Sequence, residues 1–346
     1  MDTPDGTLNP SRTERREGRG RFVRLAAGYV VGAACLVWLF HDVHPREILS
    51  SVARFQWQWA ALAIVFDILS YICQGGRWRL LLHPLGEIGI LKTTQAIYAG
   101  LFASEVLPMR FGEVVRMYLV SRWLHVDFAE LLSSIVVERL FDGVWLALSI
   151  GIAAIFVPVP ENLLDAADVF GAIILATVML FVFLVMRRRK GPSKVPVETA
   201  TVWKPIRLAT RMWRHMEDGL WRIGLSREFW GSFGLSLAML AVQAVSFWLM
   251  MLACGLWMSF WTGTVVLLIV HLGTTIPNAP ANVGTYQFFV VIGLSLFGVD
   301  KASATAFSCV VFFFLTLPLW LIGFFSLSRS GMTLASIRQE VHRLGR

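Results

Sequence analysis

Six apolar stretches, each about as long as a membrane-spanning helix, most limit what this chain of 346 residues can fold into. Hydrophobic residues make up 56% of the chain and charged residues 16%, and the mean hydropathy is +0.64. About 20 apolar residues in a helix cross the hydrocarbon core of a bilayer. The sequence therefore predicts an all-α polytopic membrane protein with full spans at 22–41, 57–76, 131–157, 166–186, 229–254 and 303–328.

The lysines and arginines orient these spans. The tail 1–21, the loop 187–228 and the tail 331–346 are rich in arginine, and basic segments are retained on the cytoplasmic side. We therefore expect a bacterial inner-membrane protein with cytoplasmic N- and C-termini, a disordered first tail and one transmembrane domain over 22–330. The net charge of +8 fits this orientation and anionic headgroups. It does not indicate nucleic acid binding, because the arginines lie between apolar segments.

Two further apolar segments are interrupted where a helix would normally continue. Prolines and glycines break helices, and here they are Pro108 and Gly112 in LPMRFGEVVR, and Pro277, Pro280 and Gly284 in IPNAPANVGTYQ. The charge pattern requires each segment to enter and leave on one side. The sequence thus predicts two re-entrant broken helices inserted from opposite faces, as in an inverted repeat.

A short internal match supports this repeat. Pro108 corresponds to Pro277, and Val126-Asp127 corresponds to Val299-Asp300. Each aspartate is expected to be the N-cap of a long span. The two halves are predicted to be about 22–186 and 229–330.

The first break carries charge. A broken helix presents free N–H groups that attract anions, and Arg110 and Arg116 add positive charge beside them. Glu113 is three residues before Arg116, so these two are expected to pair, which leaves Arg110 to hold a phosphate. The alternative is that both arginines are anchors at the cytoplasmic edge of the membrane.

A second group of charges lies inside the following span. Glu138, Arg139 and Asp142 stand where ionised groups cost several kcal/mol unless they are paired. Arg139 is expected to reach Glu113 or Asp142. The group is interpreted as part of a substrate site or as a structural ion cluster, and the two interpretations are compatible.

The second break is neutral. It offers hydrogen-bonding side chains from Asn278, Asn282, Thr285 and Gln287. His271 precedes it on an apolar run, where a histidine is more often an interior residue than a proton carrier. Asp67, with Gln74 on the same span, is a candidate for a proton or coupling-ion site.

The sequence contains no pattern that indicates catalysis, a cofactor or a metal site. The four cysteines all fall in apolar segments without metal-ligand spacing, and we interpret them as small buried hydrophobes. An intramembrane hydrolase or transferase that uses Glu138 and Asp142 is left open as a minor alternative.

Taken together, LPMRFGEVVRMYLVSR, SSIVVERLFDGVWL and IPNAPANVGTYQ with LFGVDKASA resemble the transmembrane flippase region of lysylphosphatidylglycerol synthases. The resemblance covers about residues 22–330. It implies a lipid-translocating domain without the aminoacyl-transferase domain. The positions that match are Pro108, Arg110, Gly112, Glu113, Arg116, Glu138, Arg139 and Asp142 in the first half, and Pro277, Pro280 and Gly284 in the second.

One departure affects the expected mechanism. The second break of that family often reads Pro-Gly-Gly-x-Gly with an acid shortly after it, whereas here Pro280-Ala281-Asn282-Val283-Gly284 is followed by Gln287 in the position of the acid. A mechanism coupled to protons at that break is therefore not expected.

The resulting hypothesis is translocation of an anionic or zwitterionic phospholipid, glycolipid or isoprenoid lipid. Arg110, Arg116 and Arg139 would hold the phosphate, and Glu113, Glu138 and Asp142 would fix the arginines. Membrane lipids are the expected ligands, and a separately encoded lipid-synthesis enzyme is a candidate partner. Two alternatives remain: a secondary transporter of a small soluble anion, and a non-catalytic partner of a lipid-modifying enzyme that docks through the loop 187–228.

Overall fold

The structure, a computed structural model, is all-helical over the residues it describes. These are 29–41, 55–106, 112–157, 161–187, 219, 222–224, 226–275 and 280–330. The expected tails 1–21 and 331–346 and nearly all of the loop 187–228 lie outside the described residues. So do Pro108 and Arg110 in the first break, and Pro277 and Asn278 in the second.

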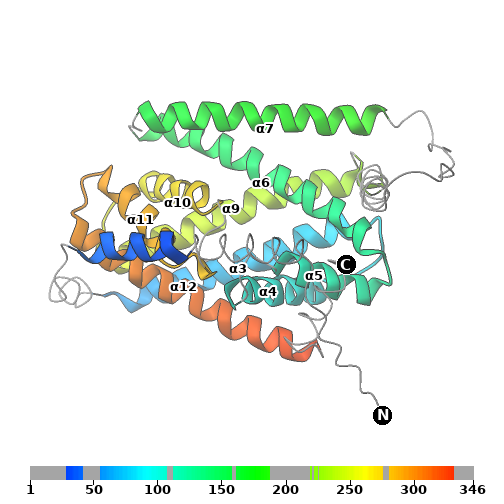
Figure 1. Ribbon diagram of the computed structural model, residues 1–346, viewed down its shortest axis with the longest axis horizontal. Coiled ribbons are helices and arrows are strands. Elements are labelled where there is room, and N and C mark those ends of the chain that lie inside the picture. Colours follow the sequence, from blue (N-terminus) through cyan, green and yellow to red (C-terminus); the bar gives the residue numbers. More distant parts are fainter. Residues whose placement is uncertain are drawn as a thin grey trace, which may run out of the picture.

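The helices follow one another in two series of similar length (Figure 1). The first series is the helix Tyr29–Phe40, α3 (Trp57–Leu82), α4 (Ile90–Val106), α5 (Gly112–Leu124) and α6 (Phe128–Phe156). The second is α7 (Glu161–Arg187), α9 (Arg227–Ala253), α10 (Phe260–Thr275), the 3₁₀ turn η3 (Pro280–Asn282), α11 (Thr285–Ser295) and α12 (Lys301–Arg329).

Four helices in the described part of the chain, α3, α6, α9 and α12, are long and apolar enough to cross a membrane. They correspond to four of the six predicted spans, and the all-α polytopic fold is confirmed. The predicted span 22–41 is described only as the shorter helix Tyr29–Phe40, and 166–186 lies within α7. The second predicted span ends too early at residue 76, because α3 continues to Leu82.

The first interrupted segment forms a tight antiparallel helical hairpin of α4 and α5, called hairpin 1. The carbonyl oxygen of Gly112 lies 2.7 Å from the position that a Cβ on Gly100 would occupy, and Gly112 itself packs on the backbone of Gly100 and on Ser104. A side chain at either glycine would push the helices apart. α4 and α5 therefore run in opposite directions, in close contact.

The second interrupted segment forms hairpin 2, made of α10, η3 and α11. Gly273 packs against Phe289, and Gly293 packs against Val266, so α10 and α11 are also antiparallel. The turn between them uses left-handed backbone at Ala281, Asn282 and Gly284, with φ of 58°, 52° and 89°. Only glycine adopts such angles without cost.

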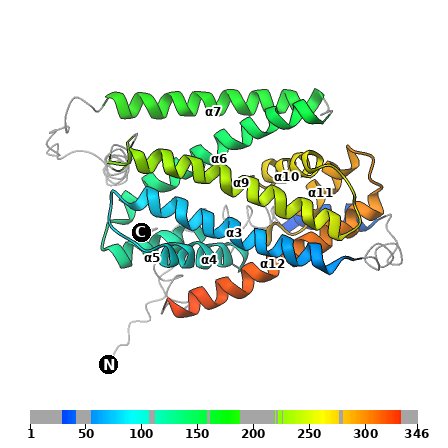
Figure 2. The same cartoon turned by 180° about the vertical axis from the view of Figure 1, so that it is seen from behind.

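The two series are inverted relative to each other. The central pair α3 and α9 packs antiparallel along its length: the Gln56 N–H donates to the Ala253 carbonyl at 2.9 Å, and the Ser246 hydroxyl donates to the Ala63 carbonyl at 2.8 Å. Each closing helix packs on the hairpin of the other half, α6 on α10 and α12 on α4. The hairpins consequently lie at opposite ends of the bundle (Figures 1 and 2).

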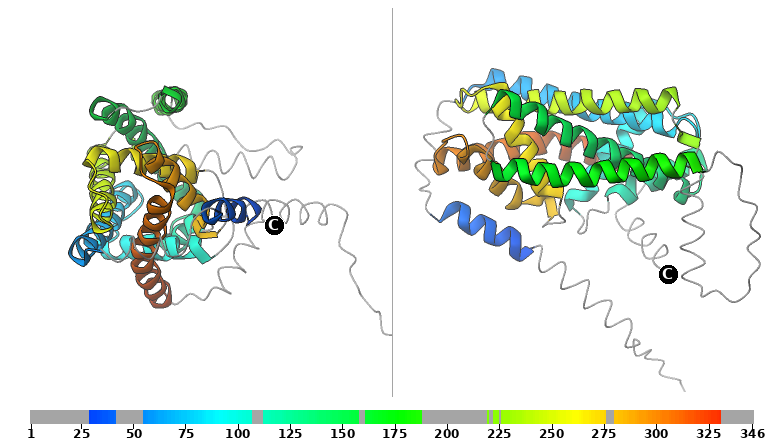
Figure 3. Two further views of the ribbon diagram at one scale, coloured as in Figure 1. Left: turned by 90° about the vertical axis from the view of Figure 1, so that its left-hand side faces the viewer. Right: turned by 90° about the horizontal axis from the view of Figure 1, so that it is seen from above.

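Asp127 and Asp300 occupy matching N-cap positions, before α6 and α12, as the internal match predicted. Only the Asp300 carboxylate caps its helix, by accepting from the Ser303 N–H at 2.8 Å. Two helices lie on the outside of the bundle: α7 packs on α6, where Ile174 covers Gly143, and the helix Tyr29–Phe40 packs on Gly284 through the backbone of Gly32 (Figure 3). The limits of the two halves as domains stay a prediction.

We predict that the Gly112→Ala substitution destabilises the protein by about 1–3 kcal/mol, because the new methyl group overpacks the contact between α4 and α5. Gly151→Ala on α6 is the matched control, since nothing lies within 4 Å of that position and alanine favours the helix. Denaturant titration in micelles measures both variants. Equal stability of the two would show that hairpin 1 is less tightly packed than described here.

Candidate functional site

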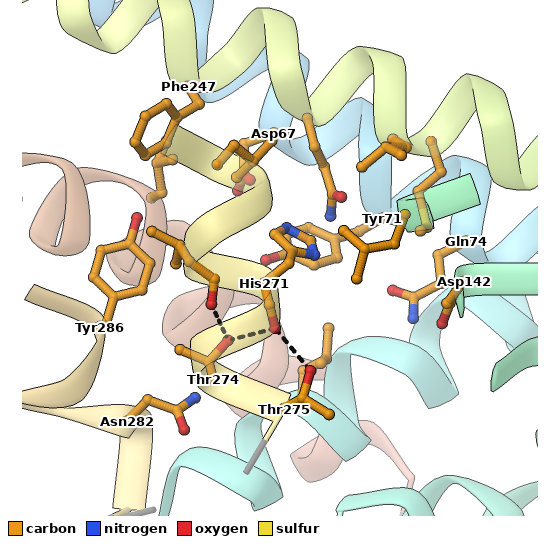
Figure 4. A pocket seen from close by; sticks show the side chains of 18 of the residues that line it. Asp67, Tyr71, Gln74, Asp142, Phe247, His271, Thr274, Thr275, Asn282 and Tyr286 are labelled. Carbon is orange, nitrogen blue, oxygen red and sulfur yellow. Dashed lines mark hydrogen bonds between the residues drawn. The ribbon is translucent and has the colours of Figure 1, made fainter. Parts of the chain in front are cut away.

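A cavity of about 740 Å³ lies between the two hairpins. All four long helices contribute residues from the middle of their length: Tyr71 from α3, Asp142 from α6, Leu240 from α9 and Leu315 from α12. Hairpin 1 contributes Leu101, Glu105 and Glu113, and hairpin 2 contributes His271, Thr274, Thr275, Ala281 and Asn282. The cavity is therefore at half height in the bundle and is bordered by residues of both hairpins. Figure 4 shows the side chains of α3, α6, α9 and hairpin 2 that face it.

One wall of this cavity is held by a network of ion pairs that is buried at its centre and accessible at one edge. It is called the ion-pair cluster and consists of Arg77, Glu113, Arg116, Glu138, Arg139 and Asp142. Glu138 is its centre, 1% exposed, and accepts from Arg77 at 2.6 Å and from Arg116 at 2.7 Å. Arg77 also pairs with Asp142, and its guanidinium lies 3.3 Å from the Ser236 hydroxyl. The cluster thus joins α3, α5, α6 and α9.

Arg77 is not among the residues predicted for the site, because the second span was predicted to end at residue 76, one residue before it. It is instead 1% exposed and lies inside α3. The signal was present in the sequence: three leucines, at positions 80, 81 and 82, follow it and continue the apolar helix. A buried guanidinium needs carboxylate partners, and α6 supplies both of them.

The predicted pairing of Glu113 with Arg116 is wrong. Arg116 points from α5 to Glu138 and stacks on Trp78, with its guanidinium carbon 4.9 Å from the ring centre. Glu113 pairs instead with Arg139. Arg116 is 5% exposed and does not line the cavity, so its position suits fixing Glu138 better than contacting a ligand.

Arg139 faces the cavity and pairs with both of its predicted partners, Glu113 and Asp142. It pairs with Glu113 and lies 3.6 Å from Asp142, while its own side chain is 61% exposed. All three residues line the cavity. They form the accessible edge of the cluster, with Glu138 and its two arginines behind them.

Of the two described residues of hairpin 2 that were predicted to bind substrate, Asn282 and Gln287, one lines the cavity. Asn282 lines the cavity, but Gln287 does not: its side-chain oxygen accepts from the Gly284 N–H at 2.8 Å and stabilises the turn into α11. In this structure Gln287 thus stabilises the turn, and its role in substrate binding stays a prediction. Gly284 adopts the left-handed conformation expected of a break.

The described lining is richer in acid than in base. Carboxyl groups face it at Asp67, Glu105, Glu113 and Asp142, whereas Arg139 is the single guanidinium in the lining that the structure describes. Amide, hydroxyl and imidazole groups from Gln74, Gln243, Tyr71, Tyr286, Asn282 and His271 complete the polar surface. Such a surface favours a guest that carries hydrogen-bond donors or a positive group as well as any phosphate.

Comparison with known proteins identifies the family. Residues 25–323 match the family described as the lysylphosphatidylglycerol synthase TM region. The chain belongs to this family.

Two relatives are similar to this family member over most of its length. A protein named UPF0104 membrane protein from Methanothermobacter thermautotrophicus is 24% identical over 299 residues, which cover 79% of this chain and 84% of that protein. A protein named glycosyltransferase AglD from Haloferax volcanii is 25% identical over 338 residues, or 87% of this chain and 52% of AglD. The chain thus spans about half of AglD.

For this member of the synthase TM-region family, we predict that Arg77→Met costs about 3–5 kcal/mol of stability, because it leaves the buried Glu138 with one fewer cation and removes a partner of the half-buried Asp142. Arg79→Met, two residues further along α3 and exposed, is the control. Denaturant titration in micelles gives both values. A second substitution, Glu138→Gln, should recover part of the loss; an unchanged stability in Arg77→Met would contradict the central place given to this pair.

Proposed function

We propose that the protein moves a lipid between the two leaflets of the cytoplasmic membrane, with the headgroup passing through the cavity. The observation that carries this proposal is the convergence of both broken hairpins on a cavity at half height in the bundle, whose mixed lining includes charged and hydrogen-bonding side chains. Inverted repeats with broken helices place their substrate sites at this level. Membership of the lysylphosphatidylglycerol synthase TM-region family supports the same function.

The size of the cavity favours a headgroup as the guest. A volume of about 740 Å³ lies within the usual range for small-molecule sites. A lipid needs only its headgroup sheltered, because its tails remain in the hydrocarbon. Large apolar side chains on the outside of the long helices, such as Ile155 and Phe325, supply a surface that lipid tails can follow.

The charges of the lining refine the class of headgroup. Arg139 is suited to a phosphate, whereas the carboxyl groups of Glu113 and Asp142 beside it favour a headgroup that also carries hydrogen-bond donors or positive charge. A zwitterionic headgroup, or one rich in hydroxyls, satisfies both the guanidinium and the acceptors. The name of the relative AglD, a glycosyltransferase, fits a lipid that carries a sugar.

We propose transport rather than catalysis for the acids of α6. Glu138 is engaged by two arginines and lies outside the cavity lining, and Asp142 is paired with Arg77 and Arg139. Carboxylates held in this way are poorly placed to exchange protons with a substrate.

We also propose that the protein lies in the inner membrane with both termini cytoplasmic. Labelling of introduced cysteines from either side of the membrane would test this orientation.

We predict that Arg139→Ala lowers the rate of lipid exchange roughly tenfold or more, which corresponds to at least about 1.4 kcal/mol of the barrier. The substitution removes the guanidinium in the cavity and leaves Glu113 and Asp142 facing the headgroup. Purified protein is reconstituted into liposomes with fluorescent phospholipids and glycolipids, and an impermeant quencher reports leaflet exchange. Arg122→Ala, an exposed arginine on α5, is the control and should exchange lipid as the wild type does.

Each other outcome has a specific meaning. If folded wild-type protein exchanges none of the lipids, the soluble-anion transporter or the partner of a lipid-modifying enzyme becomes the better proposal. If Arg139→Ala and the wild type exchange lipid equally, the ion-pair cluster is only scaffolding. A loss of exchange in Arg122→Ala as well would indicate a general requirement for basic residues.

A further inference from the structure

A second buried acid lies in the same cavity but apart from the ion-pair cluster. Asp67 is in the middle of α3, 6% exposed, and lines the cavity (Figure 4). Its Oδ2 atom forms no hydrogen bond with any described residue. Asp67 is ten residues before Arg77 on the same helix, a separation of about 15 Å along the axis.

The surroundings of Asp67 provide no counter-charge among the described residues. The titratable and charged groups that line the cavity with it, or that lie close to it, are Tyr71 on α3, Tyr98 and Glu105 on α4, Glu113 on α5, Arg139 and Asp142 on α6, His271 on α10 and Tyr286 on α11. α9 contributes the amide of Gln243, and α12 contributes Thr316. The one guanidinium in this set, Arg139, is already paired with Glu113 and Asp142.

A carboxylate in this position is costly as an anion. Burial without a cation costs several kcal/mol, and binding a proton removes that cost. A metal ion is a poorer explanation, because the described residues contain no group of three or more acid, histidine or cysteine side chains that would hold one. Water or a headgroup that brings donors to Oδ2 would instead stabilise the anion and release the proton to the cavity water.

We propose that Asp67 is a proton-binding site within the cavity, separate from the ion-pair cluster, and that its proton is exchanged each time the cavity takes up or releases its polar guest. The coupling to lipid movement rests on the proposed function, whereas the proton site itself does not. The energy of a pH gradient would then act on the cavity through Asp67, and the ion-pair cluster would keep its charges throughout.

Infrared spectroscopy of the protein in lipid nanodiscs tests the proton site without any transport assay. A protonated carboxylic acid has a carbonyl band that the carboxylate lacks. We expect this band in the wild type near neutral pH and a smaller band in Asp67→Asn. Asp300→Asn is the matched control: the Ser303 N–H holds the pKa of the Asp300 carboxyl below its usual value, so this substitution should leave the band unchanged. Identical bands in the wild type and Asp67→Asn would overturn the proposal.

Leaflet exchange under an imposed pH gradient tests the coupling. We expect the gradient to change the exchange rate of the wild type and of Asp300→Asn, and Asp67→Asn to lose that response. Asp67→Glu, which restores a carboxyl, should recover it and shows that a loss in Asp67→Asn is not simply misfolding. An equal response in the wild type and Asp67→Asn would overturn the coupling.

The two measurements separate this inference from the proposed function. A proton band that depends on Asp67, together with no exchange of any lipid, supports the proton site and overturns lipid translocation. Lipid exchange without an infrared band that depends on Asp67 supports lipid translocation and overturns the proton site.

Discussion

The pairing of Arg77 with Glu138 is the interaction on which the rest of the site depends. Both side chains are almost wholly buried, and neither would be stable there alone. Once paired, they fix α3 against α6, while Arg116 adds α5 and the contact with Ser236 adds α9. The position of hairpin 1, and with it one wall of the cavity, follows from this junction.

The two halves have the same arrangement of helices, but only the first has charged side chains at its hairpin. Both have a closing helix of 29 residues and an antiparallel hairpin held by close glycine contacts. In the first half the hairpin is tied to its closing helix by charges. In the second, the turn is stabilised by the amide of Gln287 on Gly284 and by contact of Gly284 with the helix Tyr29–Phe40. An inverted repeat therefore supplies two similar walls, and only one of them carries fixed charge.

Most of the fold could be predicted from the sequence, because apolar length, prolines and basic loops are local signals. Apolar length predicted α3, α6, α9 and α12, and the breaks predicted both hairpins. The partners within the site could not be predicted in the same way. Helical spacing suggested that Glu113 pairs with Arg116, but the packing of α5 on α6 brings each of them to a different residue. Arg77 was missed for a related reason: an arginine near the end of an apolar run looks like an interfacial anchor until its partners on another helix are known.

Two buried carboxyl groups in one protein illustrate how surroundings decide a role. Glu138 pairs with two guanidinium groups and is fixed as an anion, so its charge holds α3 and α5 against α6. Asp67 has an oxygen without a partner among the described residues and borders the cavity, which supports the proposal that its charge depends on what the cavity contains. The first arrangement resists change because breaking either pair strands a buried charge. The second is sensitive to change, since a proton, water or a headgroup donor can each satisfy the same oxygen. In the proposed transport, the ion-pair cluster would hold the cavity wall in place, and the protonation of Asp67 would follow the contents of the cavity.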